Sequence, residues 1–218
     1  GRTFRNDGIR FKAKAVDNHS TYWGEKLPFN KSGSYFLGGN EGGVSEGATY
    51  KLRSTVFELG GSGWISVKMG GHAKFYVYEV GEDGADSLVG AFLTTRFADG
   101  PNMTLAKDDA GNWTGSWLDM APYALDLSNY KGQDYRGKKL YIELEDYAES
   151  GWGIATFDDV ITYYESAPDL TQTETVNNRT TNGVVIGTID IGWVNLSEGS
   201  QQAGILVRQA LPPEKRKK

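Results

Sequence analysis

Apolar and aromatic residues alternate with polar ones over short runs along this chain, and most runs end at glycine, asparagine or aspartate. Ile9 and Phe11, for example, alternate with Arg10 and Lys12. A period of two predicts a strand with one buried face. The runs that fit this pattern occupy residues 9–15, 34–37, 50–59, 64–69, 75–80, 87–92, 114–118, 139–144 and 154–163.

Many strands at a spacing of about ten residues, separated by glycine turns, predict an all-β fold: an antiparallel β-sandwich of jelly-roll type, galactose-binding-like or concanavalin-like. The doublets Gly60-Gly61 and Gly70-Gly71 bracket one strand, and turn geometry with positive φ is the simpler explanation for them. Residues 124–130 are the one segment where a helical turn is expected, since Asp126 and Ser128 can cap it.

The same pattern divides the chain into a large sandwich, a linker, a hairpin and a tail. Residues 1–164 are expected to form the sandwich, and residues 165–183, which are polar and lack alternation, a linker or crossing loop. Residues 184–211 contain two further apolar runs. Because an isolated hairpin is barely stable in water, they should dock on the sandwich or belong to a neighbouring domain. The basic residues 212–218 are expected to be a disordered tail.

Composition narrows the function classes. The 218 residues carry 23 Lys and Arg against 28 Asp and Glu, for a formal charge of −5, which is not the electrostatic pattern of a nucleic-acid binder. The absence of cysteine excludes disulfides, thiolate catalysis and thiolate-bound zinc. No run approaches the 18 consecutive apolar residues of a membrane span. Glycine, at 29 residues, is about twice as frequent as usual, which fits a turn-rich folded chain.

Catalytic motifs are absent from the sequence: there is no nucleophile elbow, phosphate-binding loop, dinucleotide fingerprint or histidine pair with metal-ligand spacing. Sugar-binding chemistry is better represented. Sugar hydroxyls favour charged hydrogen-bonding partners, and the apolar faces of sugars favour flat aromatic rings. Glu41 follows a glycine turn, and Asp146 precedes Trp152, which has glycine on both sides. Those glycines leave two alternatives open, an indole exposed to a ligand or a core tryptophan packed against close backbone.

Several pieces of the chain, in this order, carry a family resemblance. They are residues 35–41 (YFLGGNE), 52–71 (LRSTVFELGGSGWISVKMGG), 140–146 (LYIELED), 151–153 (GWG) and 157–160 (FDDV). Together they resemble carbohydrate-binding module family 66, the β-sandwich module attached to levanases and related multidomain glycoside hydrolases. The resemblance spans residues 8–164 and says nothing about the rest of the chain.

This resemblance implies a non-catalytic module that binds the terminal, non-reducing sugar of a polysaccharide, which is fructose in levan-binding members. The implied carbohydrate-binding residues are Glu41, Arg53, Asp146 and Trp152, with Lys68, His72 and Arg96 as neighbours that can face the same site. For each charged residue in this set, a solvated position on a sheet face is the simpler alternative.

A structural calcium ion is one of two alternatives for Asp158 and Asp159, because sandwiches of this type often hold their terminal strands together through hard oxygen ligands. In the other alternative, one carboxylate caps a loop and the other is exposed. Asp158 and Asp159 are the candidate metal ligands. Adjacent strand residues point to opposite faces, so one of the two carboxylates should be directed inward. A buried carboxylate needs a cation or hydrogen bonds.

The sequence therefore predicts an extracellular or cell-surface bacterial carbohydrate-binding module, monomeric within a larger glycoside hydrolase, that recognises fructose-type or other furanose or pyranose ends and is not itself an enzyme. Its expected partner is a carbohydrate ligand, with no nucleic acid and no membrane span. The alternative is a structural or adhesive β-sandwich domain of a cell-surface protein.

Overall fold

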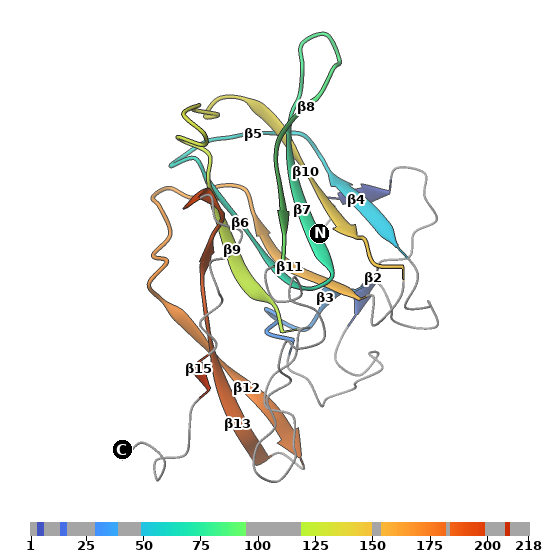
Figure 1. Cartoon of the computed structure of the whole chain (residues 1–218), viewed down its shortest axis with the longest axis vertical. Coiled ribbons are helices and arrows are strands. Elements are labelled where there is room, and N and C mark those ends of the chain that lie inside the picture. The colour runs from blue at the N-terminus through green and yellow to red at the C-terminus, as the bar shows by residue number, and fades with distance from the viewer. Residues whose placement is uncertain are drawn as a thin grey trace.

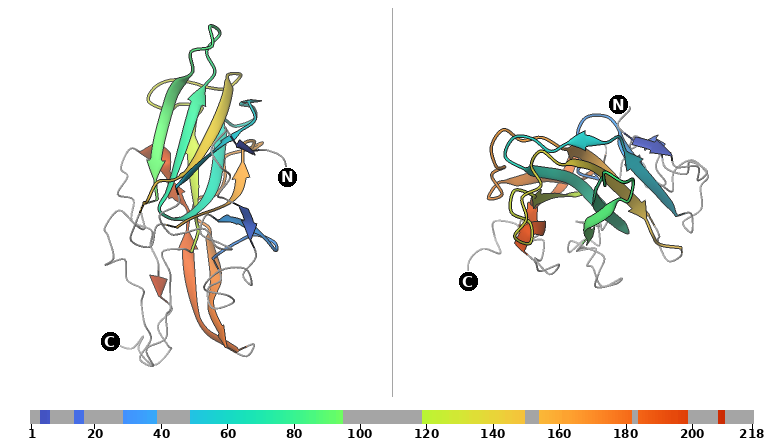
Figure 2. Two further views of the ribbon diagram at one scale, coloured as in Figure 1. Left: turned by 90° about the vertical axis from the view of Figure 1, so that its right-hand side faces the viewer. Right: turned by 90° about the horizontal axis from the view of Figure 1, so that it is seen from above.

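The computed structural model describes residues 4–6, 14–16, 29–38, 49–94, 119–149, 154–181, 184–198 and 208–209. They form two six-stranded sheets that lie face to face, and a third, smaller sheet near the C-terminal end of the chain (Figure 1; Figure 2). The all-β class expected from the alternation is confirmed. No helix in the described ranges has the length and apolar character needed to cross a membrane.

Sheet 1 has five strands in the order β1-β4-β10-β7-β8, and β5 pairs with one end of β10. Their bounds are β1 Phe4–Asn6, β4 Tyr50–Ser54, β5 Phe57–Glu58, β7 Ala73–Glu79, β8 Ser87–Leu93 and β10 Lys139–Asp146. All of these pairings are antiparallel.

Sheet 2 has the order β14-β9-β6-β11-β3-β2. Its strands are β2 Lys14–Val16, β3 Phe36–Gly38, β6 Trp64–Gly71, β9 Ala121–Asp126, β11 Ala155–Ile161 and β14 Val194–Asn195. All pairs in this sheet are antiparallel except β14 with β9, which is parallel.

The strand pairs are nested along the chain. β7 pairs with β8, β6 with β9, β4 with β10 and β3 with β11, and successive pairs alternate between the two sheets. A long hairpin of strands folded over on itself in this way is a jelly roll, so the expected topology is confirmed.

Alternation along the strands builds one core between the sheets, because every second side chain of a strand faces the same side. Each fully buried large apolar side chain contributes about 1.5–3 kcal/mol to folding relative to an exposed one. The core includes Leu52, Phe75, Val77, Leu140, Ile142 and Leu144 from sheet 1, and Ile65, Val67, Met69, Tyr123, Leu125 and Phe157 from sheet 2.

The outer face of sheet 2 is covered as well. Ser66 and Lys68, whose side chains leave β6 on that face, are both buried. Tyr164, which follows β11, makes a 2.6 Å hydrogen bond through its hydroxyl to Ser66 Oγ and accepts one from Ser62 N through its carbonyl oxygen. Glu174 lies 2.9 Å from the Lys68 ammonium. The chain after β11 therefore runs along the outer face of β6.

The C-terminal segment differs in part from what the sequence indicates. Residues 173–181 lie in the expected linker but form β12 (Thr173–Thr181), which pairs with β13 (Val184–Gly192), and β13 in turn pairs with β15 (Arg208–Gln209). Figure 1 shows β12 and β13 as a ribbon that extends beyond the two large sheets. Val176, Ile191 and Val194 nevertheless join the common core. The division of the chain into a sandwich and a separate docking hairpin remains a prediction.

The expected helical turn at residues 124–130 is replaced by the end of β9 and a turn. Asp126 Oδ1 accepts hydrogen bonds from both Ser128 N and Ser128 Oγ. The two residues expected to cap a helical turn instead close a turn after a strand, since strand pairing with β6 outweighs the local helical tendency. After β14, Leu196–Glu198 form a short 3-10 helix, η3.

Gly61, in the first glycine doublet, is required both for its backbone conformation and for the close approach of another segment. Gly61 has φ +57, and a Cβ placed there would lie 2.2 Å from the carbonyl oxygen of Tyr164. Gly84 also has positive φ, at +82, but a Cβ there would meet nothing within 4 Å. We expect Gly84→Ala to cost about 1 kcal/mol of unfolding free energy, and Gly61→Ala several times more.

Urea unfolding of the two variants measures the difference, and Gly84→Ala is the matched control for the φ penalty alone. Equal losses of stability would show that the chain after β11 does not approach the turn as closely as described.

Candidate functional site

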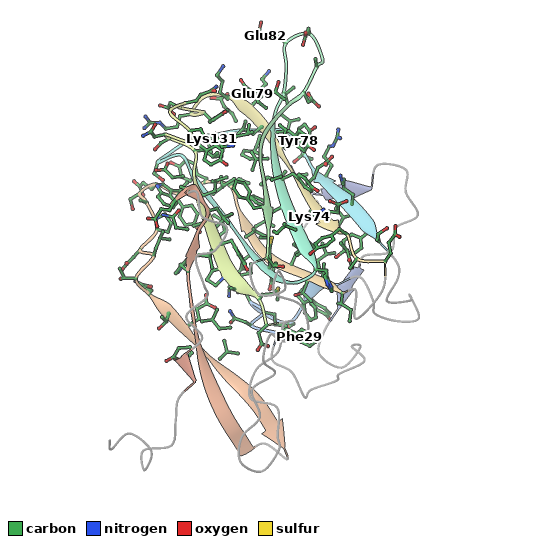
Figure 3. All side chains as sticks on the ribbon, viewed as in Figure 1. Phe29, Lys74, Tyr78, Glu79, Glu82 and Lys131 are labelled. Carbon is green, nitrogen blue, oxygen red and sulfur yellow. The ribbon has the colours of Figure 1, made fainter. Side chains whose placement is uncertain are left out.

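The outer face of sheet 1 collects aromatic and charged side chains. Alternation on its three central strands sends the apolar residues inward and leaves a polar set on the other side. We call this set the tyrosine face: Lys51 and Arg53 on β4, Tyr76 and Tyr78 on β7, and Tyr141, Glu143 and Glu145 on β10. Register places Glu143 directly between Arg53 and Tyr76, and Tyr141 beside Tyr78. Figure 3 shows Tyr78 and Lys74 along β7.

The three tyrosines form a continuous row of ring contacts with a cation at each end. Tyr78 stacks on Tyr141 with ring centroids 4.9 Å apart, and on Tyr76 at 6.2 Å. The Lys51 ammonium lies 4.9 Å from the Tyr76 centroid, and the Arg53 guanidinium lies 4.4 Å from that of Tyr141. Stacked aromatic pairs and cation–π contacts each contribute on the order of 1 kcal/mol. The row is therefore ordered without any ligand.

A buried carboxylate joins the two cations. Arg53 donates to Glu143 Oε1 from Nε at 3.1 Å and from Nη2 at 2.9 Å, and Lys51 Nζ lies 3.6 Å from Glu143 Oε2. The Glu143 side chain is only 5% exposed, whereas those of Lys51 and Arg53 are 37% and 33% exposed. A buried charge is tolerated when it is paired. Glu143 therefore fixes both cations while leaving part of each accessible.

The tyrosine hydroxyls stay protonated at physiological pH. Burial and a hydrogen bond donated to Glu145 raise the pKa of Tyr76 well above its usual value. Burial and a hydrogen bond to Asp86 raise the pKa of Tyr141 to about 12. Burial, followed by the charge of Glu143, also raises the pKa of Tyr78. The face therefore offers neutral hydroxyls beside cations and one partly exposed carboxylate, Glu145.

The tyrosine face continues towards the turn after β10. Lys74 lies opposite Glu145 on β7, and its ammonium is 4.3 Å from the ring centroid of Tyr147. Tyr147 also makes an edge contact with His72 at 5.6 Å. His72, an expected ligand-binding residue, is buried between β6 and β7, and its backbone N–H donates to the Ile154 carbonyl at 2.8 Å. It is placed to support Tyr147 at this end of the face.

Asp146 is fully buried. Its Oδ1 accepts from Ala148 N at 3.4 Å and its Oδ2 from Ala155 N at 3.2 Å, so the carboxyl spans both ends of the turn that contains Trp152 in the sequence. Burial raises the pKa of Asp146 to about 7. In this arrangement Asp146 shapes the turn, and its expected contact with sugar remains a prediction.

Lys68, Asp158 and Asp159 come together on the opposite side of the sandwich, on the outer face of sheet 2. Lys68 Nζ lies 3.5 Å from Asp159 Oδ2, and Asp158 Oδ2 accepts from Ser32 N at 2.7 Å. Lys68 is thus separated from the tyrosine face. Of the binding residues expected from sequence, Arg53 lies on that face, His72 is buried behind its end, and Asp146 points from β10 to the inner side of the sheet, while Glu41, Arg96 and Trp152 lie outside the described residues.

The surroundings of Asp158 and Asp159 bear on the expected calcium ion. Calcium takes about six to eight oxygen ligands, and an ammonium group already lies among these carboxylates. Among the residues described, no three His, Cys, Asp or Glu side chains are grouped as metal ligands. The metal-binding role of the two aspartates stays a prediction that chelation can test.

Sequence reasoning missed most of the tyrosine face. The sequence does contain a pattern that indicates this face. Tyr76 and Tyr78 occupy the alternate positions of β7 that face away from the core, and Tyr141, Glu143 and Glu145 occupy those of β10. Aromatic residues in the phase of the charged residues face outward with them. What the sequence does not contain is the register that brings β4, β10 and β7 side by side.

No family model and no curated protein matches the sequence. Solved structures give weak likenesses. The family 61 carbohydrate-binding module TmCBM61, in complex with β-1,4-galactotriose, has a TM-score of 0.37 and 11% identity, covering 72% of this chain and 86% of that one.

Two further structures are similar at the same level. CBM27-1 of Caldicellulosiruptor saccharolyticus, in complex with mannohexaose, has a TM-score of 0.33 and 14% identity, covering 76% of this chain and 92% of that one. The K3 adhesin domain of Lys-gingipain from Porphyromonas gingivalis has a TM-score of 0.33 and 13% identity, covering 71% and 92%. None of the three belongs to family 66 by its description, so membership of that family remains a prediction.

The buried carboxyl of Asp146 predicts a pH effect on stability. Its pKa is about 7 in the folded chain and 3.8 in the reference state, so the folded protein retains a proton that the unfolded chain loses. The resulting stabilisation is fully present below about pH 4 and is lost as pH rises through 7, by on the order of 4 kcal/mol at most.

Asp146→Asn should remove this dependence, because an amide does not titrate. Burial also raises the pKa of Asp158, but its contribution cancels when the variant is compared with the parent chain. The measurement is the midpoint of urea unfolding from pH 4 to pH 8 for both proteins. If the two midpoints changed with pH in parallel, the raised pKa of Asp146 would be contradicted. A constant difference between the two proteins would not matter, because Asn keeps only one acceptor oxygen and can lower stability at every pH.

Proposed function

We propose that this chain is a non-catalytic carbohydrate-binding module that contacts sugar through the tyrosine face. The observation that carries the proposal is the row Lys51, Tyr76, Tyr78, Tyr141, Arg53, preorganised around the buried Glu143. Sugar hydroxyls both donate and accept hydrogen bonds, and this face supplies partners for both roles. The covered outer face of sheet 2 is less suited to a ligand.

The ring contacts influence how a sugar would bind. The tyrosine rings contact one another and the two cations, so much of their flat surface is already used. We therefore expect hydroxyl groups and ring edges, with Lys51, Arg53 and Glu145, to make the main contacts.

The finer parts of the proposal rest on the family-66 resemblance. They are recognition of terminal non-reducing sugars, fructose ends of levan among them, and attachment to a glycoside hydrolase outside the cell that the module directs to its substrate. A single sugar offers few atoms, so we expect a Kd of about 1 mM to 1 μM. Several chain ends on one branched polysaccharide would raise the apparent affinity without new contacts.

Binding to a panel of polysaccharides tests the function. The panel contains levan, arabinan, β-1,4-galactan and mannan, the last two because modules with weakly similar structures were solved with such oligosaccharides. We expect retardation on affinity gels with at least one of these polysaccharides, and no release of reducing sugar. If no polysaccharide of a broad panel were bound, an adhesive domain would be favoured. Release of reducing sugar would refute the non-catalytic assignment.

Tyr78→Ala tests the site. It breaks the centre of the ring row while leaving the ion pairs of Glu143 in place, so we expect at least about tenfold weaker binding and a loss of about 2 kcal/mol of stability from the two ring contacts. The matched control is Tyr35→Ala, since Tyr35 is a 60% exposed tyrosine that precedes β3 of the other sheet. Titration calorimetry with the polysaccharide that binds gives both values. Equal affinities of the two variants would place the site elsewhere.

A further inference from the structure

A buried ammonium group lies where calcium was expected. Lys68 leaves the middle of β6 on the outer face of sheet 2, and only 8% of the residue is exposed. Its Nζ donates to Glu174 Oε2 at 2.9 Å, Ser32 Oγ at 3.2 Å and the Asn30 carbonyl at 3.4 Å, and lies 3.5 Å from Asp159 Oδ2. The ammonium thus has four oxygen neighbours.

These oxygens come from segments that are far apart in the sequence. Asn30 and Ser32 precede β3, Asp159 belongs to β11, and Glu174 is the second residue of β12. With β6 itself, four segments meet at one nitrogen atom. None of the three other segments is adjacent to β6 in the sequence, so their contact depends on the folded state.

An irregularity in β11 brings both aspartates to this place. The register with β6 shifts between Asp158 and Ile161, and Asp159 has φ +44. Regular strand geometry would send the two side chains to opposite faces. Here Asp158 accepts from Ser32 N, and Asp159 accepts from Ser32 Oγ. The bulge therefore collects two carboxylates around one serine, beside the ammonium.

We propose that the Lys68 ammonium performs the structural role expected of calcium, as one internal cation that fastens residues 29–34, β11 and β12 to β6. Three carboxylates, those of Asp158, Asp159 and Glu174, lie around it. A divalent ion among them would be repelled by the ammonium, which already occupies the centre of these oxygens. Stability at this place should then depend on Lys68 and not on a calcium ion held by Asp158 and Asp159.

Thermal unfolding of the full chain tests this dependence. Chelation with EDTA, or addition of calcium chloride, should leave the Tm of the parent protein within about 1 °C of its value in buffer. Lys68→Met keeps the length of the side chain and removes the charge. The substitution leaves several carboxylates without their shared cation, although the side chains of Asp159 and Glu174 are 37% and 38% exposed, so we expect Tm to fall by about 5 °C.

Lys138→Met is the matched control. Lys138 lies 3.1 Å from Glu79 but is 50% exposed, and a surface pair contributes little, so Tm should fall by about 2 °C or less. A drop in Tm on chelation would overturn the proposal in favour of calcium. Equal effects of the two lysine substitutions would overturn it as well.

Glu174→Gln distinguishes loss of the specific contact between Lys68 and β12 from a general loss of stability. If the ammonium fastens β12, Lys68→Met and Glu174→Gln should be non-additive, because each removes the same contact. Amide exchange in Lys68→Met should also accelerate in β12 more than in β7, which belongs to the other sheet. Additive effects, or uniform acceleration across both strands, would refute the role of Lys68 as a fastener.

Discussion

Each sheet of a sandwich has one face in the core and one outer face. The chain after β11 determines which of the two outer faces of this protein is exposed to water. By running along β6, it buries the polar outer residues of sheet 2 and obliges them to find partners inside the protein. The corresponding face of sheet 1 keeps its partly exposed cations. The two outer faces therefore use the same residue types for different purposes. On one, charge fastens segments together; on the other, it remains within reach of a ligand.

Glu143 and Lys68 illustrate the two uses. Each is a buried charge that the fold must neutralise, and each gathers opposite charges from other strands. Around Glu143 the partners are long, flexible cations whose ends reach solvent. Around Lys68 the partners are carboxylates from β11 and β12 that also reach the surface, since the side chains of Asp159 and Glu174 are 37% and 38% exposed. The two sites differ in which charge is buried: an anion shared by two cations on the face proposed to bind sugar, and a cation shared by carboxylates on the face proposed to fasten the chain.

Much of the fold follows from local pattern, and much of the site does not. Alternation identifies β4, β6, β7, β8, β10 and β11 within a few residues, because each buries one face in a shared core. It misses β9, whose run Ala121–Leu125 is buried on both faces and so does not alternate, and β12, whose residues are mostly polar. The tyrosine face depends on register between strands about 90 residues apart, as between Arg53 and Glu143. Lys68 and the aspartates were assigned separate roles because nothing in the sequence marks the bulge in β11.

The nested order of the strand pairs also bears on how the chain reaches its native state. The β7–β8 hairpin joins neighbouring segments, whereas β3 and β11 are separated by nearly the whole sandwich. Pairing such distant strands lowers the conformational entropy of the chain before the contacts of the core have formed to stabilise it. Folding is therefore slow in folds of high contact order. We expect the inner hairpin to form early and the outer pairs to close late. During synthesis, sheet 2 has no complete centre until β11 has emerged, so one edge of β6 lacks its hydrogen-bonding partner until that moment.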